Sequence, residues 1–172
     1  MHDNIDLKYK ASKIKALVFD VDGVMTDGSL TFDENGVEYK TFNAKDGQGI
    51  VMATRAGFVT AIITARTNGT VRHRFNNLGM TKLYEGQKNK ALALADLMEE
   101  YKLNLEEIAY MGDDLPDLCI LEKVGLPCAP ADAVDEVLQT AQFISSKNGG
   151  RGAVRELCNF ILQCAGSNII GK

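Results

Sequence analysis

The sequence predicts an α/β fold built on a doubly wound parallel sheet, with a small β-hairpin inserted into it. Short apolar runs alternate with segments of helical periodicity, which is typical of repeated strand–helix units. The run 16–19 (ALVF) is apolar throughout, as expected of a strand that is covered on both faces. With 172 residues, 45% hydrophobic and 24% charged, and without a repeat or long linker, the chain is expected to form one domain over residues 1–172.

The individual elements follow from this alternation. Strands are expected at the apolar runs 16–20, 59–64, 81–84, 108–112 and 124–129, with a weaker one at 142–145. Helical periodicity predicts helices over 47–56, 68–78, 88–101, 115–122, 133–140 and 152–165. Residues 29–42 break the alternation and are predicted to form a β-hairpin with Asn35-Gly36 at its turn.

The hairpin is unusually apolar for an exposed ribbon. Its apolar side chains are Leu30, Phe32, Val37, Tyr39 and Phe42. A lone two-stranded ribbon is marginally stable in water, and exposed apolar patches of this kind mark interaction sites. We therefore expect the hairpin to be buried between subunits.

Composition excludes several classes of function. The net charge is −4 and no basic run is present, which argues against a nucleic-acid partner. His2 and His73 are the only histidines, which argues against a zinc enzyme or a serine–histidine hydrolase. Residues 1–15 are polar and lysine-rich, so neither a signal peptide nor a membrane partner is expected, and the predicted location is cytoplasmic. The four cysteines have no CxxC spacing and are expected to be buried free thiols.

Two carboxylates stand at the end of the first strand. Asp20 and Asp22 follow its apolar run, and Gly23 lets the chain turn sharply. Ligands of α/β proteins bind at the carboxyl ends of parallel strands. Two acids at that edge repel each other unless a cation or a proton lies between them. The arrangement therefore indicates a reactive site.

Other element ends are expected to converge on the same crevice. Thr64 ends the second strand, Asp113 follows the strand at 108–112, and Lys90 opens a helix. The carboxylates of Asp20 and Asp113, with one backbone carbonyl, suit Mg²⁺, while a hydroxyl and an ammonium suit phosphate oxygens. The reaction indicated is phosphoryl transfer, in which Asp20 attacks phosphorus and Asp22 moves the proton. Each motif alone has a structural alternative, such as a capped turn or a solvated lysine.

The four motifs Asp20-x-Asp22-Gly23, Ile63-Thr64, Lys90 and Gly112-Asp113-Asp114-x-x-Asp117 resemble those of the haloacid dehalogenase-like phosphotransferases. This resemblance implies a Rossmann-like core with Asp20 as nucleophile and Asp22 as general acid/base. It also implies that Asp20, the Asp22 carbonyl and Asp113 hold Mg²⁺, and that Thr64 and Lys90 bind the phosphoryl group. Asp114 and Asp117 take supporting roles.

Many members of that family carry a cap domain after the first or second motif, and this chain has no room for one. The gap from Asp22 to Thr64 holds only the hairpin and one helix, and the gap from Thr64 to Lys90 holds one helix and one strand. A bare site must admit a large substrate or be closed by another subunit that keeps water out.

A closer resemblance covers nearly the whole chain. Residues 20–28 (DVDGVMTDG), 42–47 (FNAKDG), 84–90 (YEGQKNK) and 149–156 (GGRGAVRE) resemble the family of 3-deoxy-D-manno-octulosonate 8-phosphate phosphatases. The resemblance implies a capless homotetramer whose hairpins join in a central barrel, with a neighbouring subunit completing each site. It also implies release of phosphate, to give the free sugar acid used in lipopolysaccharide biosynthesis. One departure is Ala65, where the family usually has glycine.

Such a substrate carries a phosphate and a carboxylate. Arg66 follows Thr64, and Arg74 is expected two turns along the same helix, so that two guanidiniums at one mouth take the carboxylate bidentately. The alternative is a pair of solvated helix arginines. The loop of Asn43, Ala44, Lys45, Asp46 and Gly47 offers groups for sugar hydroxyls, or forms an Asx-type turn that leads into a helix. Arg151 and Arg155 either reach a neighbour's site or cap the last helix.

Two rival functions remain open at this point. One is the same chemistry on a nine-carbon, sialic-acid-like 9-phosphate. The other is a non-catalytic tetramerisation module of the same fold. Asp20, Asp22, Lys90 and Asp113 are all intact, which argues against the module because a relic need not keep them.

Overall fold

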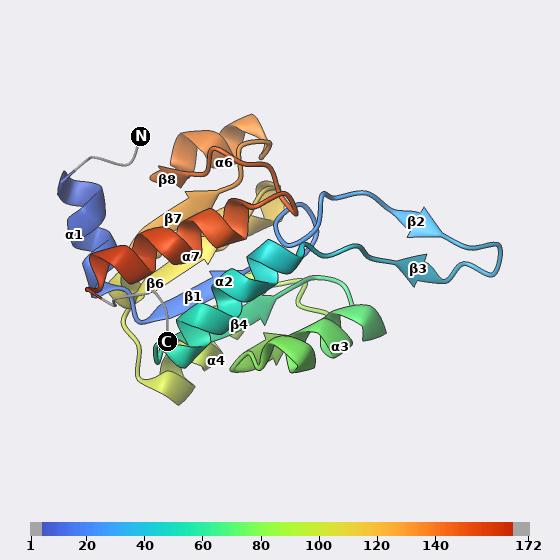
Figure 1. The fold of residues 1–172 in the computed structure, drawn as a ribbon, viewed down its shortest axis with the longest axis horizontal. Coiled ribbons are helices and arrows are strands. Elements are labelled where there is room, and N and C mark those ends of the chain that lie inside the picture. Colours follow the sequence, from blue (N-terminus) through green and yellow to red (C-terminus); the bar gives the residue numbers. More distant parts are fainter. Residues whose placement is uncertain (1–4, 167–172) are drawn as a thin grey trace.

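The computed structural model describes residues 5–166, and its centre is a six-stranded sheet (Figure 1). The strand order is β5-β4-β1-β6-β7-β8, and every neighbouring pair is parallel. The strands are β1 (Ala16–Phe19), β4 (Val59–Ile63), β5 (Lys82–Tyr84), β6 (Ile108–Met111), β7 (Leu126–Ala129) and β8 (Phe143–Ile144). The predicted parallel sheet is confirmed, with each strand one or two residues shorter than its apolar run.

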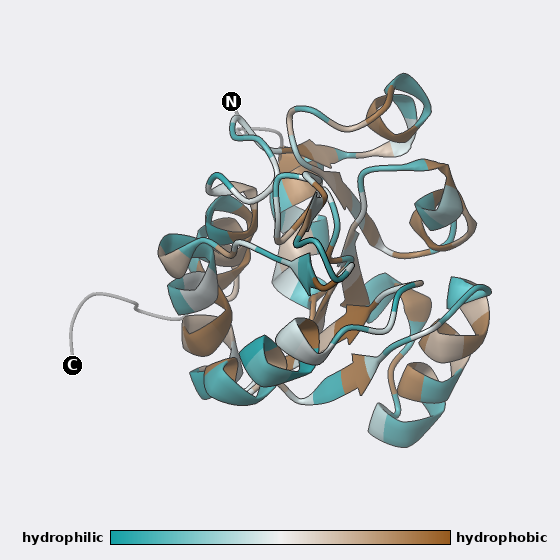
Figure 2. Ribbon diagram, turned by 90° about the vertical axis from the view of Figure 1, so that its right-hand side faces the viewer, coloured by the Kyte–Doolittle hydropathy of each residue, from teal (hydrophilic) through white to brown (hydrophobic). Residues whose placement is uncertain are grey.

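Helices cover both faces of the sheet (Figure 1). One layer contains α1 (Ile5–Lys13), α2 (Ala44–Arg55), α3 (Gly69–Leu78) and α7 (Ala153–Cys164). The opposite layer contains α4 (Lys90–Tyr101), α5 (Leu118–Leu121) and α6 (Asp135–Thr140). Figure 2 shows the apolar strands enclosed between these layers. The fold is therefore doubly wound, as predicted.

Three helical segments differ from the prediction. Helix α1 was not expected, because only Leu7 and Ala11 of its polar sequence are buried, too few to give a clear period. The predicted helix 115–122 divides into a 3₁₀ turn, η2 (Leu115–Asp117), and the short α5. A second 3₁₀ turn, η1 (Leu105–Glu107), precedes β6.

Strand β1 shows why its run lacks alternation. Leu17 and Phe19 point into the layer of α2 and α7, whereas Ala16 and Val18 point into the layer of α4. All four side chains are fully buried. Phe19 is in register with Ile62 of β4 and Met111 of β6, so these three strands end level with one another. The residues that follow them therefore meet at one edge of the sheet.

The predicted hairpin is present and extends away from the body of the molecule (Figure 1). It consists of β2 (Thr31–Phe32) and β3 (Glu38–Tyr39), paired antiparallel. The Gly36 N–H donates to the carbonyl of Asp33 at 3.0 Å, and Gly36 has φ +78°, a conformation that favours glycine. The exposed apolar side chains are Leu30, Phe32, Val37 and Tyr39. Phe42 instead packs against the core, which corrects its assignment to the ribbon.

The part of the chain that the structure describes contains no cap domain, either between β1 and β4 or between β4 and α4. The segment from β1 to β4 holds the hairpin and α2, and the segment from β4 to α4 holds α3 and β5. Of the cysteines, Cys128 and Cys158 are buried, whereas Cys119 and Cys164 are half-buried, and all four are free thiols. Among residues 5–166, no helix combines the length and the apolar composition needed to cross a membrane.

Candidate active site

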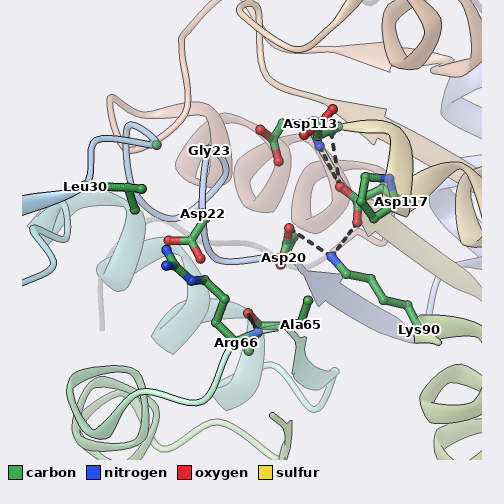
Figure 3. A pocket seen from close by; sticks show the side chains of 13 residues that line it. Asp20, Asp22, Gly23, Leu30, Ala65, Arg66, Lys90, Asp113 and Asp117 are labelled. Carbon is green, nitrogen blue, oxygen red and sulfur yellow. Dashed lines mark hydrogen bonds and ion pairs between the residues drawn. The ribbon is translucent and has the colours of Figure 1, made fainter. Parts of the chain in front are cut away.

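A cleft of about 340 Å³ opens at the carboxyl edge of the sheet (Figure 3). It brings together eight residues that the sequence singled out: Asp20, Asp22, Thr64, Arg66, Lys90, Asp113, Asp114 and Asp117. Its wall also contains Gly23, Gly28, Leu30, Ala65 and Pro116. The strand ends converge because β1, β4 and β6 are adjacent and end level.

Lys90 lies between two carboxylates. Its Nζ is 2.9 Å from Oδ2 of Asp20 and 2.7 Å from Oδ1 of Asp117 (Figure 3). The side chain starts α4, whose first turn is capped by Asn89, and it is buried. Burial alone would lower the pKa of Lys90, but the two carboxylates outweigh burial and raise it. Lys90 is therefore a fixed positive charge beside Asp20.

Asp117 has both of its oxygens engaged within the chain. Oδ1 accepts from Lys90 and from the Tyr110 hydroxyl at 2.6 Å, and Oδ2 accepts from the N–H groups of Asp113 and Asp114 at 3.0 and 3.3 Å. Asp117 therefore positions Lys90 and the loop after β6. Tyr110 was missed by the sequence analysis, although a tyrosine within a buried strand needs a partner for its hydroxyl.

The carboxylates of Asp20, Asp113 and Asp117 offer oxygens within 4.8 Å of one another. Since both oxygens of Asp117 are already engaged, Asp20 and Asp113 are the two candidates for binding a cation. Oδ1 of Asp113 is buried and accepts no hydrogen bond from the described residues. Burial and the charge of Asp20 raise the pKa of Asp113 to about 8. Burial and the charge of Asp117 raise the pKa of Asp20 to about 6, although the positive charge of Lys90 acts to lower it. An unpartnered buried oxygen beside a repelling carboxylate fits a divalent cation with oxygen ligands, such as Mg²⁺.

Gly23 is fixed by its closeness to Asp113. Its φ is +80°, and a Cβ at this position would lie 1.9 Å from Oδ2 of Asp113. Any other residue would therefore displace the Asp113 carboxylate from its place in the cleft. The glycine of the first motif is thus required by a close approach as well as by the turn.

Asp22 is held by a residue that the sequence analysis missed. Nζ of Lys40 forms an ion pair with Oδ1 of Asp22 and lies 3.0 Å from Oε1 of Glu38. Glu38 also pairs with Nη1 of Arg66 at 3.0 Å and accepts from Nδ2 of Asn68 at 3.0 Å. The available signal was the spacing of Glu38 and Lys40, which places both on one side of the strand.

Thr64 and Ala65 form the loop after β4. Thr64 is buried, its N–H donates to the carbonyl of Tyr84 at 2.9 Å, and its carbonyl accepts from Gln87 at 3.0 Å. Its hydroxyl accepts from the N–H of Arg66 at 3.4 Å. Ala65 contributes to the wall of the cleft, so the one departure from the resembled motifs lies at the cleft itself.

The two arginines do not lie together. Arg66 precedes α3, which begins at Gly69, so the expectation that both arginines share one helix is wrong. Arg66 lines the cleft, whereas Arg74 is not among the residues that line it. Nη2 of Arg74 instead donates to the carbonyl of Asn43 at 3.3 Å, and its guanidinium lies 5.8 Å from the ring centre of Phe42. Within one chain, Arg74 supports the start of α2.

The predicted substrate loop also makes structural contacts. Oδ1 of Asn43 caps α2 by accepting from Lys45 and Asp46 at 2.8 and 3.4 Å, as in the Asx-type alternative. Nδ2 of Asn43 donates to the carbonyl of Gly150 at 3.2 Å. Ala44 opens the helix. None of these residues lines the cleft in the part of the chain that the structure describes.

Asp46 and Gly47 complete this contact between α2 and the loop before α7. The buried carboxylate of Asp46 accepts from the N–H groups of Gly152 and Arg155 at 3.2 and 2.8 Å. A Cβ at Gly47 would lie 2.1 Å from Nη2 of Arg74. Arg155 itself donates to the carbonyl of Lys45 at 3.4 Å.

Arg151, which the sequence left unassigned, pairs with Asp27 at 2.8 Å near the mouth of the site. The glycines beside it approach the first motif closely, since a Cβ at Gly149 would lie 1.8 Å from the carbonyl oxygen of Gly23. The loop before α7 therefore supports the turn that follows Asp22.

Comparisons with known proteins show which proteins the chain is similar to. A family model of haloacid dehalogenase-like hydrolases matches residues 57–157. The chain is 45% identical over 161 residues to the 3-deoxy-D-manno-octulosonate 8-phosphate phosphatase KdsC of Escherichia coli K12, covering 94% of this chain and 86% of the relative.

Solved structures give the same result. A probable YrbI-family phosphatase of Pseudomonas syringae superposes with a TM-score of 0.94 at 45% identity, covering 96% of this chain and 94% of that one. A 3-deoxy-D-manno-octulosonate 8-phosphate phosphatase of Moraxella catarrhalis, in complex with magnesium, phosphate and KDO, has a TM-score of 0.91 at 35% identity, covering 95% and 94%.

Proposed function

The chain belongs to the 3-deoxy-D-manno-octulosonate 8-phosphate phosphatases within the haloacid dehalogenase-like hydrolases, and we propose that it hydrolyses this phosphomonoester with Mg²⁺ as cofactor. The products are 3-deoxy-D-manno-octulosonate and phosphate, in lipopolysaccharide biosynthesis. The observation that carries the proposal is the placement in one cleft of Asp20, Lys90 and Asp113, whose Oδ1 has no hydrogen-bond partner among the described residues.

The proposed mechanism has two steps. A carboxylate oxygen of Asp20 attacks phosphorus and forms an aspartyl-phosphate, while the bond from phosphorus to the sugar oxygen breaks and Asp22 gives that oxygen a proton. Asp22 then takes a proton from a water molecule that attacks the phosphoryl group, which releases phosphate and restores Asp20. Lys90 and Thr64 hold the phosphoryl oxygens, and Lys90 offsets their negative charge.

Magnesium would be held by Asp20, Asp113 and the backbone carbonyl of Asp22. When bound, the ion would offset the negative charges of the phosphoryl group and of the carboxylates, so that an anionic nucleophile could approach an anionic substrate. The raised pKa of Asp113 and its unpartnered Oδ1 support this assignment.

The carboxylate of the substrate is proposed to bind Arg66. Its guanidinium lines the same cleft and is 43% exposed, so it is accessible to a ligand. A guanidinium binds a carboxylate in a bidentate manner, which an ammonium cannot do. We also propose that Arg74 and residues 43–47 contact the substrate, at a site that is shared with a neighbouring subunit.

We propose that the hairpin assembles the chain into a homotetramer. Leu30, Phe32, Val37 and Tyr39 are each more than half exposed, although they are large apolar side chains. Their burial against other copies would remove an apolar surface from water and close the uncapped cleft. Light scattering at micromolar concentration tests this, and a monomer would contradict it.

The proposed location is the cytoplasm. The substrate is tested by measuring phosphate release from 3-deoxy-D-manno-octulosonate 8-phosphate and from a nine-carbon, sialic-acid-like 9-phosphate, each with Mg²⁺ and with EDTA. We expect kcat/KM to favour the eight-carbon compound and EDTA to abolish release. A higher kcat/KM for the nine-carbon compound would mean that the enzyme acts on the rival substrate by the same chemistry. Absence of phosphate release from both compounds would refute the proposal.

A further inference from the structure

Glu38 and Lys40 are charged side chains in the second half of the hairpin that the mechanism above does not use. Alternation along an extended strand places both on one side and Tyr39 on the other. Tyr39 is exposed, whereas the Lys40 side chain is only 2% exposed. A buried lysine requires charged partners, so the contacts of Lys40 identify its role.

These contacts form a continuous series of alternating charges. Lys40 pairs with Oδ1 of Asp22 and with Oε1 of Glu38, and Glu38 in turn pairs with Nη1 of Arg66. Asp22 is the residue that moves the proton, and Arg66 is the residue proposed to bind the substrate carboxylate. The second half of the hairpin therefore contacts a residue proposed to act at each end of the substrate.

We propose that Lys40 is a positioning residue for Asp22 and that Glu38 is a positioning residue for Arg66. Lys40 engages Oδ1 of Asp22 and leaves Oδ2 for proton exchange with the sugar oxygen. Glu38 holds the Arg66 guanidinium from one side and leaves the rest of its donors for the substrate. This inference rests on the proposed function, because it names what orients the two residues during that reaction.

The physical reason for an effect on rate is orientation. Without Lys40, the Asp22 side chain can adopt rotamers that point away from the leaving oxygen, and small misplacements of a proton donor are costly. The effect depends on the leaving group, because a sugar alkoxide must receive a proton as it departs, whereas nitrophenolate leaves without one. A structural defect would instead slow both substrates alike.

The test is the first-turnover release of the leaving group, measured by rapid quench for the sugar-acid phosphate and by absorbance for p-nitrophenyl phosphate. We expect Lys40→Met to slow release of the sugar acid by about tenfold or more. It should leave nitrophenolate release nearly unchanged. Lys40→Arg should recover much of the lost rate, because it restores a cation to Asp22. An equal loss with both substrates, or no loss with either, would overturn the role of Lys40.

The role of Glu38 predicts a different response. Glu38→Gln should raise KM for the sugar-acid phosphate several-fold and leave KM for p-nitrophenyl phosphate unchanged, because only the first substrate has a carboxylate for Arg66. Equal KM changes for both substrates would refute it. For Lys40→Met, the matched control is Lys15→Met, because it removes the ion pair of Lys15 with Glu107 and neither residue lines the cleft.

The outcomes separate this inference from the proposed function. If the wild-type protein releases no sugar acid, the proposed substrate is wrong. If the wild-type protein turns over the substrate and Lys40→Met and Glu38→Gln both match it, only the positioning roles are wrong. Melting temperatures of all variants identify any that are unfolded, and Lys40→Arg then provides the comparison.

Discussion

Gly23 and Asp113 approach so closely that a Cβ on Gly23 would lie 1.9 Å from Oδ2 of Asp113. The two residues belong to different motifs, and their contact joins the turn after β1 to the loop after β6. Because Asp113 is proposed to hold Mg²⁺, the contact would also make the proposed metal site depend on a residue that has no side chain.

The first prediction follows from this contact. Gly23→Ala should reduce activity by at least about a hundredfold, because the methyl group displaces the Asp113 carboxylate and strains the positive φ. Phosphate release over a range of Mg²⁺ concentrations measures the effect. Gly69→Ala is the matched control, since a Cβ there meets nothing within 4 Å. Wild-type Mg²⁺ dependence in Gly23→Ala would contradict the geometry.

Tyr110→Phe tests how Asp117 is held. The Tyr110 hydroxyl donates to Oδ1 of Asp117 at 2.6 Å inside the fold, and its loss should lower the free energy of unfolding by about 1–3 kcal/mol. We expect activity to fall as well, because Asp117 positions Lys90. Tyr84→Phe removes a hydrogen bond of the same length to Asp96 at an exposed position and should change both quantities much less. Denaturant unfolding that shows equal losses for the two variants would argue against a special role for Tyr110.

The stabilisation by Mg²⁺ should grow as pH rises. In the metal-free protein, burial is the main cause that raises the pKa of Asp113 to about 8 and of Asp20 to about 6, whereas an unfolded aspartate titrates near 3.9. The folded state therefore binds more protons, and its free energy of unfolding falls as pH rises from about 4 to about 8. Magnesium must displace these protons.

The measurement is the increase in Tm on adding a fixed concentration of Mg²⁺ at pH 6 and at pH 8. We expect the increase to be larger at the higher pH, with most of the difference lost in Asp113→Asn. A larger increase at pH 6 would contradict the assignment of Asp113 as a ligand.

Arg66→Ala and Arg74→Ala should behave differently. Arg66 lines the cleft, so its loss should raise KM for the sugar-acid phosphate more than it alters the affinity for Mg²⁺. Arg74 contacts the start of α2, so its loss should also lower Tm. Steady-state kinetics and thermal melts separate the two. An unaltered KM in Arg66→Ala would count against a carboxylate contact.

The sheet and the main site residues could be predicted because each depends on local sequence. An unbroken apolar run defines β1, and parallel strands must end at the same edge, so Asp20, Thr64 and Asp113 could be brought together without coordinates. Helix α1 escaped prediction because its stability depends on packing against α7 more than on its own pattern.

Residues whose roles depend on tertiary contacts could not be predicted. The sequence alone indicates that Lys40 is an exposed lysine on a hairpin. Its ion pair with Asp22 depends on how the hairpin packs beside the cleft. Arg74 was placed beside Arg66 by its spacing, whereas the helix begins after Arg66 and directs Arg74 to Asn43. The predicted helix 68–78 also begins after Arg66, so an eight-residue spacing could not place Arg66 on the same helix face as Arg74.

The central claim is that Asp20 is the nucleophile of a Mg²⁺-dependent phosphatase. Its most direct test is to quench the enzyme in acid during turnover, reduce it with borohydride, and locate the modified residue by mass spectrometry. An aspartyl-phosphate at Asp20 would appear as homoserine at that position, only when substrate and Mg²⁺ are both present, and Asp20→Asn would be folded but inactive. Modification at another residue, or turnover by Asp20→Asn at the wild-type rate, would contradict the account.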